Sequence, residues 1–317
     1  NNLLTIGDYI IQTQEHLGDG GQGSVLKGFN KKTMEKVAVK VINIGDGHAR
    51  LAFESEFQAM SKLTSKTTNV CEIKDVFQQS GVGYLIMKQY DCDLFTYAID
   101  MRETPIPEAE LKRLFVRICR GVRDLHRERI AHLDLKLENV LLDLTTMDPF
   151  ICDFGSAFTS ASATKNRRRS RAALQEIPAL GVRGTRKFSS PEMNISPFAY
   201  DPFRADIYSL GVILHVLATM YYPVIGENDA VDLTWLQGKV PSGCLELLTA
   251  LLQPCPTERY YIDKILDHPW LATKKINFKF VHRAKQAVGS HAPQKRGRRM
   301  SVCVSAPQKQ GRRMSVC

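Results

Sequence analysis

This sequence of 317 residues lacks several features that would set its class at once. No apolar run, including Leu210 to Leu217, is long enough to span a membrane, because Gly or His interrupts the longest ones. The eight cysteines show neither CxxC nor Cys/His spacing, so they predict no zinc site and favour a reduced, intracellular compartment. We therefore expect a globular protein of the cytoplasm without a membrane span.

Acidic residues are also missing from one end of the chain, where none follows Leu271. Twelve of the 43 Lys and Arg residues lie between Leu271 and Cys317, whereas residues 1–270 carry 31 basic and 33 acidic residues. The net charge of +10 therefore belongs to the tail, which disfavours a uniformly basic nucleic-acid-binding domain. The tail alone could still bind polyanions or allow entry into the nucleus.

Apolar patterning divides the rest of the chain into a strand-rich part and a helix-rich part. Residues 8–45 and 70–90 are rich in Val, Ile and Tyr with Gly-containing turns, which predicts an antiparallel sheet. A helix is expected between them over 49–63, where apolar residues recur at helical intervals: Leu51, Phe53, Phe57, Met60 and Leu63. After about residue 94, helices are expected from Pro107 and over 206–220, 242–252 and 259–267.

Two segments fit neither part. Residues 159–183 are rich in Ser, Ala and Arg and predict a mobile loop, and residues 272–317 predict a disordered basic tail. Within the tail, Ala292–Cys303 recurs fourteen residues later as Ala306–Cys317, with one position changed. The repeat is too short and polar to build a solenoid, so it is either a repeated linear motif or a duplication without function.

Three glycines near the start of the predicted sheet, Gly18, Gly20 and Gly23, form a GxGxxGxV motif with Val25. Glycines let backbone amides approach phosphate groups, because no Cβ obstructs them. The motif alone is equally typical of a plain hairpin turn. Because residues 24–28 continue as strand rather than helix, a hairpin that covers phosphates is favoured over a dinucleotide-binding fold.

A lysine, Lys40, ends the strand-like Val-Ala-Val-Lys run seventeen residues after Gly23. That position favours a phosphate-binding lysine over an exposed edge lysine, and such a lysine needs a carboxylate partner from a helix. Glu54 and Glu56 are both available in the predicted helix. We favour Glu56, because the apolar residues that follow it have the spacing that would turn it inward, and Glu54 is the solvated alternative.

The most informative stretch is His132-Leu-Asp-Leu-Lys-Leu-Glu-Asn139. This stretch resembles the catalytic loop of a protein kinase, in which an Asp orients the acceptor hydroxyl and an Asn five residues on holds a metal ion, and Asp134 and Asn139 have that separation. Asp153-Phe-Gly follows fourteen residues after Asn139 and would supply a second metal-binding carboxylate.

With these motifs in this order, the chain resembles a eukaryotic protein kinase of the serine/threonine type from about residue 8 to 271, similar to the calcium/calmodulin and cyclic-AMP-dependent types. Four shorter elements extend the resemblance: Ser189-Ser-Pro-Glu192, Asp206-Ile-Tyr-Ser-Leu-Gly211, Pro256-Thr-Glu-Arg259 and His268-Pro-Trp270. The resemblance implies a bilobal α+β fold. A small antiparallel β-sheet lobe with one helix would cover about 8–90, a larger, mainly helical lobe would cover about 94–271, and residues 1–7 would be an extension.

The resemblance also implies ATP and Mg²⁺ as cofactors and proteins as substrates. Asp134 would orient the acceptor hydroxyl, Lys136 would neutralise charge on the transferring phosphoryl group, and Lys40 would act with Glu56. Asn139 and Asp153 would hold the magnesium ions. The residues expected to line the ATP site are Gly18, Gly20, Gly23, Val25, Ala38, Lys40, Asp93 and Leu141. Those expected in structural or regulatory roles are Thr185, Glu192, Asp206 and Arg259.

One residue of the loop departs from the family pattern, which usually has Arg at position 133. That Arg pairs with a phosphorylated residue of the activation segment, and Leu133 cannot do so. We therefore hypothesise that activity does not require phosphorylation through this route. A pseudokinase or signalling scaffold with weak catalysis is the alternative, and the complete catalytic set disfavours it.

Three serines follow paired arginines at the second and third positions before them: Ser170, Ser301 and Ser315. They resemble phosphorylation sites of basophilic kinases and the inhibitor segment of the cyclic-AMP-dependent enzyme's regulatory partner. The chain could favour such sites itself through Glu138 and Asp93, although Val216 stands where the cyclic-AMP-dependent enzyme has Glu. The tail is thus either an autophosphorylated or self-inhibiting substrate mimic, a substrate of another basophilic kinase, or unused.

Overall fold

The computed structural model describes residues 2–20, 23–63, 67–160, 183–195, 200–226 and 229–272. The chain divides into two units, Asn1–Ile276 and Asn277–Cys317, and all of the described residues belong to the first. The second unit, with Ser301 and Ser315, lies outside the described residues, and so does most of the loop expected over 159–183, with Ser170.

Six strands in the first part of the chain form one antiparallel sheet in the order β1-β2-β3-β4-β6-β5. Their bounds are β1 Leu3–Ile6, β2 Tyr9–Gly20, β3 Gly23–Asn30, β4 Lys36–Asn43, β5 Ile73–Gln79 and β6 Val82–Lys88. Residues 1–7, expected to be an extension, therefore contribute an edge strand of this sheet. Ile6 is buried there beside Tyr9, whose hydroxyl donates a 2.6 Å hydrogen bond to Asp75.

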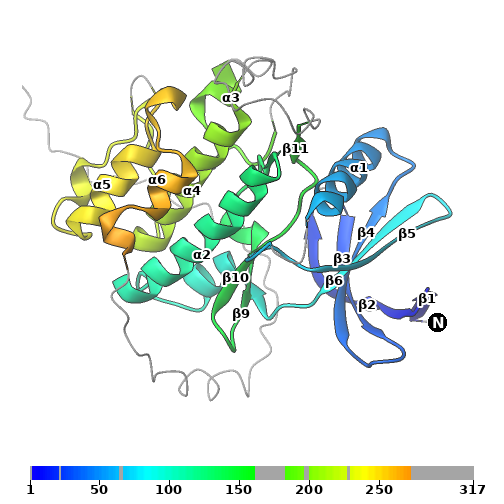
Figure 1. Ribbon diagram of the computed structural model, residues 1–317. Coiled ribbons are helices and arrows are strands. Elements are labelled where there is room, and N and C mark those ends of the chain that lie inside the picture. Colours follow the sequence, from blue (N-terminus) through cyan, green and yellow to red (C-terminus); the bar gives the residue numbers. More distant parts are fainter. Residues whose placement is uncertain are drawn as a thin grey trace, which may run out of the picture. The chain divides into compact units, whose positions relative to one another are not determined.

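The helix α1, Gly47–Lys62, packs against the sheet in Figure 1. It begins after Asp46, whose carboxylate accepts a hydrogen bond from the amide of His48. Phe53 faces the sheet, where its ring lies so close to Gly83 of β6 that a Cβ there would come within 2.6 Å. The apolar spacing predicted the helix correctly but does not mark its buried face, since Leu51 is 65% exposed and Phe57 49%. The buried residues are Ala52, Phe53, Glu56 and Ala59.

Helices dominate the second part of the chain, as Figure 1 shows. The helices are α2 Glu108–Arg127, α3 Pro191–Ile195, α4 Pro202–Thr219, α5 Ser242–Leu251 and α6 Ile262–Leu266, with short turns η1 Thr96–Asp100, η2 Leu137–Asn139, η5 Thr234–Leu236, η6 Pro256–Glu258 and η7 Pro269–Leu271. The small strands are β7 Cys92–Asp93, β8 Ile130–Ala131, β9 Val140–Asp143, β10 Asp148–Ile151 and β11 Phe158–Thr159. This is the bilobal α+β arrangement that the resemblance implies.

Two of these helices differ in length from the prediction. α4 begins four residues earlier than expected, because the Asp201 carboxylate caps it by accepting hydrogen bonds from the amides of Phe203 and Arg204 and Pro202 fits its first turn. α6 begins at Ile262 rather than 259, because Arg259 is extended. The boundaries of helices thus depended on capping residues that apolar periodicity does not register.

The core of the helical part lies between α2 and α4, which pack against each other. The helix expected from Pro107 is present as α2, and six apolar residues at helical spacing make up its buried face: Leu111, Leu114, Phe115, Ile118, Val122 and Leu125. Almost every residue of α4 is buried. The helix is therefore a closely packed support for the segments of the chain that contact it. No helix within the described ranges is both long and apolar enough to cross a membrane.

Candidate active site

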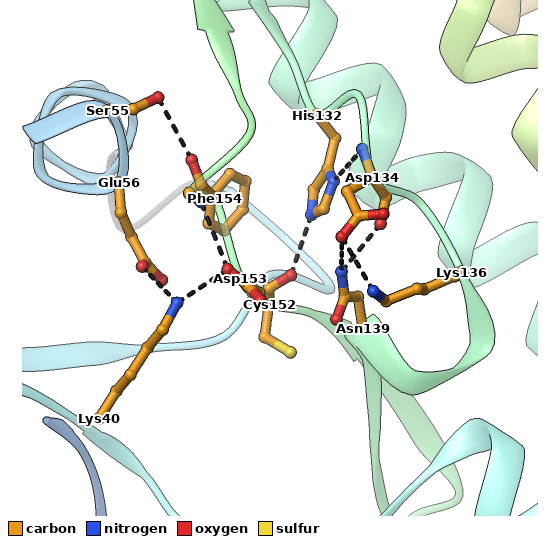
Figure 2. A network of polar contacts seen from close by, with 11 residues as sticks. Lys40, Ser55, Glu56, His132, Asp134, Lys136, Asn139, Cys152, Asp153 and Phe154 are labelled. Carbon is orange, nitrogen blue, oxygen red and sulfur yellow. Dashed lines mark hydrogen bonds and ion pairs between the residues drawn. The ribbon is translucent and has the colours of Figure 1, made fainter. Parts of the chain in front are cut away.

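A buried lysine joins the sheet to the helical part of the chain. Lys40 of β4 lies 2.7 Å from the Glu56 carboxylate of α1 and 2.8 Å from the Asp153 carboxylate (Figure 2). Of the two glutamates considered from the sequence, the structure brings Glu56 to Lys40, whereas Glu54 pairs with Arg50 on the exposed side of the same helix. Three residues distant in sequence therefore meet at one ammonium group.

The charged forms of Lys40 and Asp153 stabilise each other. Burial disfavours the ammonium form of Lys40, but the two adjacent carboxylates outweigh burial and raise its pKa. Burial likewise opposes ionisation of Asp153, and the nearby Lys40 ammonium outweighs it, so the pKa of Asp153 is lowered. Lys40 is therefore a permanent cation and Asp153 a permanent carboxylate at neutral pH, as phosphate and metal binding require.

The Asp134 carboxylate accepts three side-chain hydrogen bonds. Thr185 Oγ1 donates to its Oδ1 at 2.9 Å, while Lys136 Nζ at 3.0 Å and Asn139 Nδ2 at 3.1 Å donate to its Oδ2. Lys136 Nζ also donates to Thr185 Oγ1 at 2.9 Å. A carboxylate offers about four acceptor positions, so among the described residues one position on Oδ1 is left for an incoming hydroxyl.

The central helix α4 holds the backbone of the loop that contains Asp134. The buried Asp206 carboxylate of α4 accepts hydrogen bonds from the amides of His132 at 2.9 Å and Leu133 at 2.8 Å, and lies 2.9 Å from the His126 ring. The amide of Asp134 donates to His132 Nδ1, so the other ring nitrogen, 2.9 Å from the Cys152 carbonyl, carries the proton. His132 thereby ties the loop to the residue before Asp153 (Figure 2).

A glycine allows the activation segment of the family pattern, residues 153–192, to approach the loop that contains Asp134. Gly184 adopts a φ of +76°, and a Cβ there would overlap the carbonyl oxygen of Leu133. This close approach carries Thr185, the next residue, to Asp134.

The end of the activation segment is fixed by a buried arginine. Arg259 Nη1 and Nη2 each lie 2.6 Å from an oxygen of the Glu192 carboxylate in α3. Its remaining hydrogen bonds go to the carbonyls of Gln253, Arg204 and Pro254, so all five of its donors are used. This bidentate pair, whose arginine is fully buried and whose glutamate is partly exposed, anchors α3 on the helical core.

Three of the eight residues expected to line the ATP site lie in one apolar cluster between the sheet and β9. Val25, Ala38 and Leu141 belong to it together with Met87, Tyr90 and Cys152. Burial raises the pKa of the Cys152 thiol well above its usual value, so this cysteine is a packing residue. The cluster provides an apolar surface of the kind that a purine base needs.

Gly18 and Gly20 lie at the end of β2 and Gly23 at the start of β3, and the two strands pair antiparallel, as the hairpin interpretation requires. Gly23 has a φ of +151°, and a Cβ there would overlap the carbonyl oxygen of Val41. Nothing lies within 4 Å of the position a Cβ would take at Gly18. The described part of the hairpin therefore leaves open space at Gly18 and tolerates no side chain at Gly23.

The two acids considered for substrate recognition differ in their surroundings. Asp93 accepts hydrogen bonds from Thr96 on both carboxylate oxygens, at 2.8 and 2.9 Å, and so stabilises the first turn of η1. Glu138 is exposed at the surface of the catalytic loop, and no cation within the described ranges forms an ion pair with it. Val216 is buried in α4.

The donor set near Asp153 fits a magnesium ion. Asn139 uses its amide nitrogen for two hydrogen bonds to Asp134, which leaves its carbonyl oxygen as the donor for a metal. Asp153 has one oxygen on Lys40 and the Gly155 amide and a second oxygen without a partner among the described residues. Carboxylate and amide oxygens are the ligands that Mg²⁺ prefers.

Three residues of the site were not identified from the sequence. Ser55, Lys62 and Arg183 each donate hydrogen bonds to backbone carbonyls of residues 154–160. A side chain that binds a carbonyl needs no matching residue type, so motif spacing carries no signal for it. His126, which contacts Asp206, was missed for a different reason, because helical periodicity places it at the edge of a buried face.

Comparison with known proteins gives a consistent result. A family model described as "Protein kinase domain" matches residues 11–271. Serine/threonine-protein kinase D2 of Rattus norvegicus is 30% identical over 282 residues, which cover 83% of this chain and 30% of that protein. The probable serine/threonine-protein kinase MARK-A of Dictyostelium discoideum is 31% identical over 284 residues, covering 86% of this chain and 25% of that protein. Testis-specific serine/threonine-protein kinase 3 of Mus musculus is 28% identical over 285 residues, covering 86% and 98%. The chain thus spans about 30% of the length of the kinase D2 relatives.

Proposed function

Because the chain belongs to the protein kinase family and carries a domain of the serine/threonine type, we propose that it transfers the γ-phosphoryl group of ATP to Ser and Thr hydroxyls of proteins. The observation that supports this most is the convergence of Thr185, Lys136 and Asn139 on the Asp134 carboxylate. An Asp held in this way can accept a hydrogen bond from the acceptor hydroxyl and orient its oxygen toward phosphorus.

The remaining residues stabilise charge. Lys40, fixed by Glu56, would bind the α- and β-phosphates, and Lys136 would face the transferring phosphoryl group. Asn139 and Asp153 would hold Mg²⁺, which would neutralise charge on the phosphates. Phosphoryl transfer depends mainly on positioning and charge stabilisation, so these residues make up most of the catalytic apparatus.

A transfer assay tests the proposal. The full chain is incubated with Mg²⁺ and ATP labelled at the γ-phosphate, together with a degenerate library of peptides that contain Ser, Thr or Tyr. Label on Ser and Thr but not on Tyr is expected. Nucleotide binding without any transfer would instead support a pseudokinase or scaffold.

We further propose a preference for substrates with arginine before the phosphorylated residue. The exposed Glu138, without an ion pair among the described residues, lies one residue before Asn139 in the catalytic loop and is available to a substrate guanidinium. Asp93 contributes less in this proposal, because Thr96 already occupies both of its oxygens.

Paired peptides test this preference. A peptide with Arg-Arg-Ala-Ser should be phosphorylated at least tenfold more efficiently than one with Ala-Ala-Ala-Ser, a ratio that charge-assisted pairing would supply. Glu138→Gln should remove most of that ratio. Glu103→Gln, at another exposed acid, is the matched control. An equal ratio in wild type and Glu138→Gln would reject Glu138 as the determinant.

The repeated Arg-Arg-Met-Ser motif of the tail is proposed as a substrate mimic for this same site. Comparing the full chain with one that ends near Lys274 tests it. Self-inhibition predicts a lower KM for peptide without the tail, and autophosphorylation predicts label on Ser301 and Ser315. Unchanged kinetics with no label on the tail would leave it as a substrate of another basophilic kinase, a ligand of a regulatory subunit or a polyanion-binding segment.

A further inference from the structure

The carbonyl oxygen of Ala157 accepts hydrogen bonds from two side chains that come from different parts of the fold. Ser55 Oγ of α1 donates to it at 2.8 Å, and Arg183 Nη1 donates to it at 3.1 Å. The same guanidinium nitrogen of Arg183 donates to the Ser156 carbonyl at 3.0 Å, and Ser55 Oγ lies 3.4 Å from the Phe154 carbonyl (Figure 2 shows Ser55 and Phe154). One short backbone stretch is thus held from two sides.

Each residue of this contact lies close in sequence to a residue of the candidate active site. Ser55 precedes Glu56, the partner of Lys40. Residues 156–157 follow directly after Asp153-Phe-Gly, and Arg183 lies two residues before Thr185, which donates to Asp134. The Ala157 carbonyl therefore links the Lys40–Glu56 pair, the metal-binding Asp153 and the Asp134 loop.

These links need no phosphate group. The family's usual connection runs from an Arg at position 133 to a phosphorylated residue, and here Leu133 is buried among Ala131, Met193, Tyr200 and Ala205. The beginning of the segment has further anchors of the same kind, because Lys62 Nζ donates to the Ser160 carbonyl at 2.9 Å and β11 pairs with β8. Carbonyl acceptors are present in the unmodified chain, so these contacts do not require phosphorylation.

The geometry points to Arg183 as a positioning residue of the kinase site: its guanidinium holds the end of the activation segment against Ser156 and Ala157, in place of a phosphate-dependent contact. Ser55 is its counterpart on α1. The inference rests on the proposed phosphoryl transfer for its kinetic consequences, but the contact itself has consequences that do not depend on catalysis.

Two measurements on the full chain test this. In the first, Arg183→Ala should lower kcat at least tenfold while KM for ATP changes less than about twofold, because the Lys40 and glycine contacts to nucleotide remain. Arg183→Lys, which keeps the charge but not the guanidinium, should recover part of kcat.

Since Arg183 and Ser55 share one carbonyl, the loss of kcat in the double variant Arg183→Ala/Ser55→Ala should be smaller than the product of the two single losses. Arg50→Ala and Ser61→Ala are matched controls, because within the described ranges the Arg50 side chain pairs with the exposed Glu54 and Ser61 bonds within its own helix.

The second measurement is hydrogen exchange, which does not depend on the proposed activity. Arg183→Ala should speed amide exchange over residues 157–160 and 185–189, and Arg183→Lys should do so less. If the wild-type chain transferred no phosphate, faster exchange in Arg183→Ala would still support the contact while the kinase function was rejected. Unchanged kcat and unchanged exchange in Arg183→Ala would overturn the inference, and so would single losses that multiply in full.

Discussion

The carbonyl oxygen of Leu133 faces Gly184 at a distance that leaves no room for a side chain. Leu133 itself adopts a φ of +62°, a conformation that costs a non-glycine residue about 1 kcal/mol or more, and its amide is held by Asp206. The catalytic loop and the activation segment are therefore fitted to each other at the backbone, directly beside Asp134. The proposed chemistry depends on this fit.

Gly184→Ala should lower both kcat and the thermal midpoint of unfolding. The variant meets backbone strain at positive φ, which costs about 1–2 kcal/mol, and an overlap with the Leu133 carbonyl. Gly238→Ala is the control, because Gly238 has a φ of +72° with nothing within 4 Å of its Cβ position. Both midpoints should fall through strain, but only Gly184→Ala should lose activity. Equal activity in the two variants would show that the close approach is unimportant.

Glu56→Gln should destabilise the fold more than Glu54→Gln. Loss of the Glu56 charge removes one of the two carboxylates that lie beside the buried Lys40, and breaking a buried pair costs about 3 kcal/mol or more. The Glu54–Arg50 pair is exposed, so its loss should cost about 0.5 kcal/mol or less. Denaturant unfolding of the three proteins measures this. Similar free energies for the two variants would mean that the pair at Lys40 contributes little.

Phosphatase treatment should leave the activity of the wild-type chain unchanged. The reason is that Leu133 offers no charge to a phosphate and packs instead in an apolar cluster with Met193 and Tyr200. Ser170→Ala, at the arginine-flanked serine of the loop, should likewise retain activity. Loss of activity both after phosphatase treatment and in Ser170→Ala would contradict the hypothesis that activity does not require a phosphate group in the activation segment.

Leu133→Arg should not restore a phosphate switch but should unfold more easily. Leu133 is 4% exposed and packs in an apolar cluster with Ala131, Met193, Tyr200 and Ala205, where a guanidinium would lose its hydration. We expect a loss of about 3 kcal/mol in the free energy of unfolding. Leu133→Met, of similar volume, is the control and should cost less than about 1.5 kcal/mol. A stable, active Leu133→Arg protein would show that this pocket accepts charge.

Alkylation at pH 7.5 should modify Cys255 before the buried cysteines. A hydrogen bond from Thr257 lowers the pKa of the exposed Cys255 thiol, so the reactive thiolate forms at lower pH. Burial raises the pKa of Cys71 and Cys244 to about 12, which keeps them as thiols. Thr257→Val should shift the pH profile of Cys255 alkylation upward, as peptide mass spectrometry can follow. An unshifted profile would exclude the hydrogen bond as the cause.

The sequence allowed the residues of the proposed catalytic site to be predicted, because the chemistry proposed for them restricts residue type and spacing. Asp134, Asn139 and Asp153 could be identified in this way, and the helical spacing after Glu56 favoured it over Glu54. Arg183 and Ser55 could not be found, since both bind backbone carbonyls, and any residue supplies those. The exposure of Leu51 and Phe57 also escaped prediction, because helical spacing indicates a helix but small residues such as Ala52 and Ala59 determine which face packs.

The most direct test of the central claim is a comparison of Asp134→Asn with the wild-type chain. Asn keeps the shape of the side chain and loses the charge that would orient and accept the acceptor proton, so kcat should fall by a factor of about 100 to 10,000. ATP affinity, measured with a fluorescent analogue, should stay within about twofold. Asp134 contacts Thr185, Lys136 and Asn139 and does not belong to the apolar cluster between the sheet and β9 that is expected to hold the base. Undiminished transfer by Asp134→Asn, in a folded protein that binds ATP, would contradict the account.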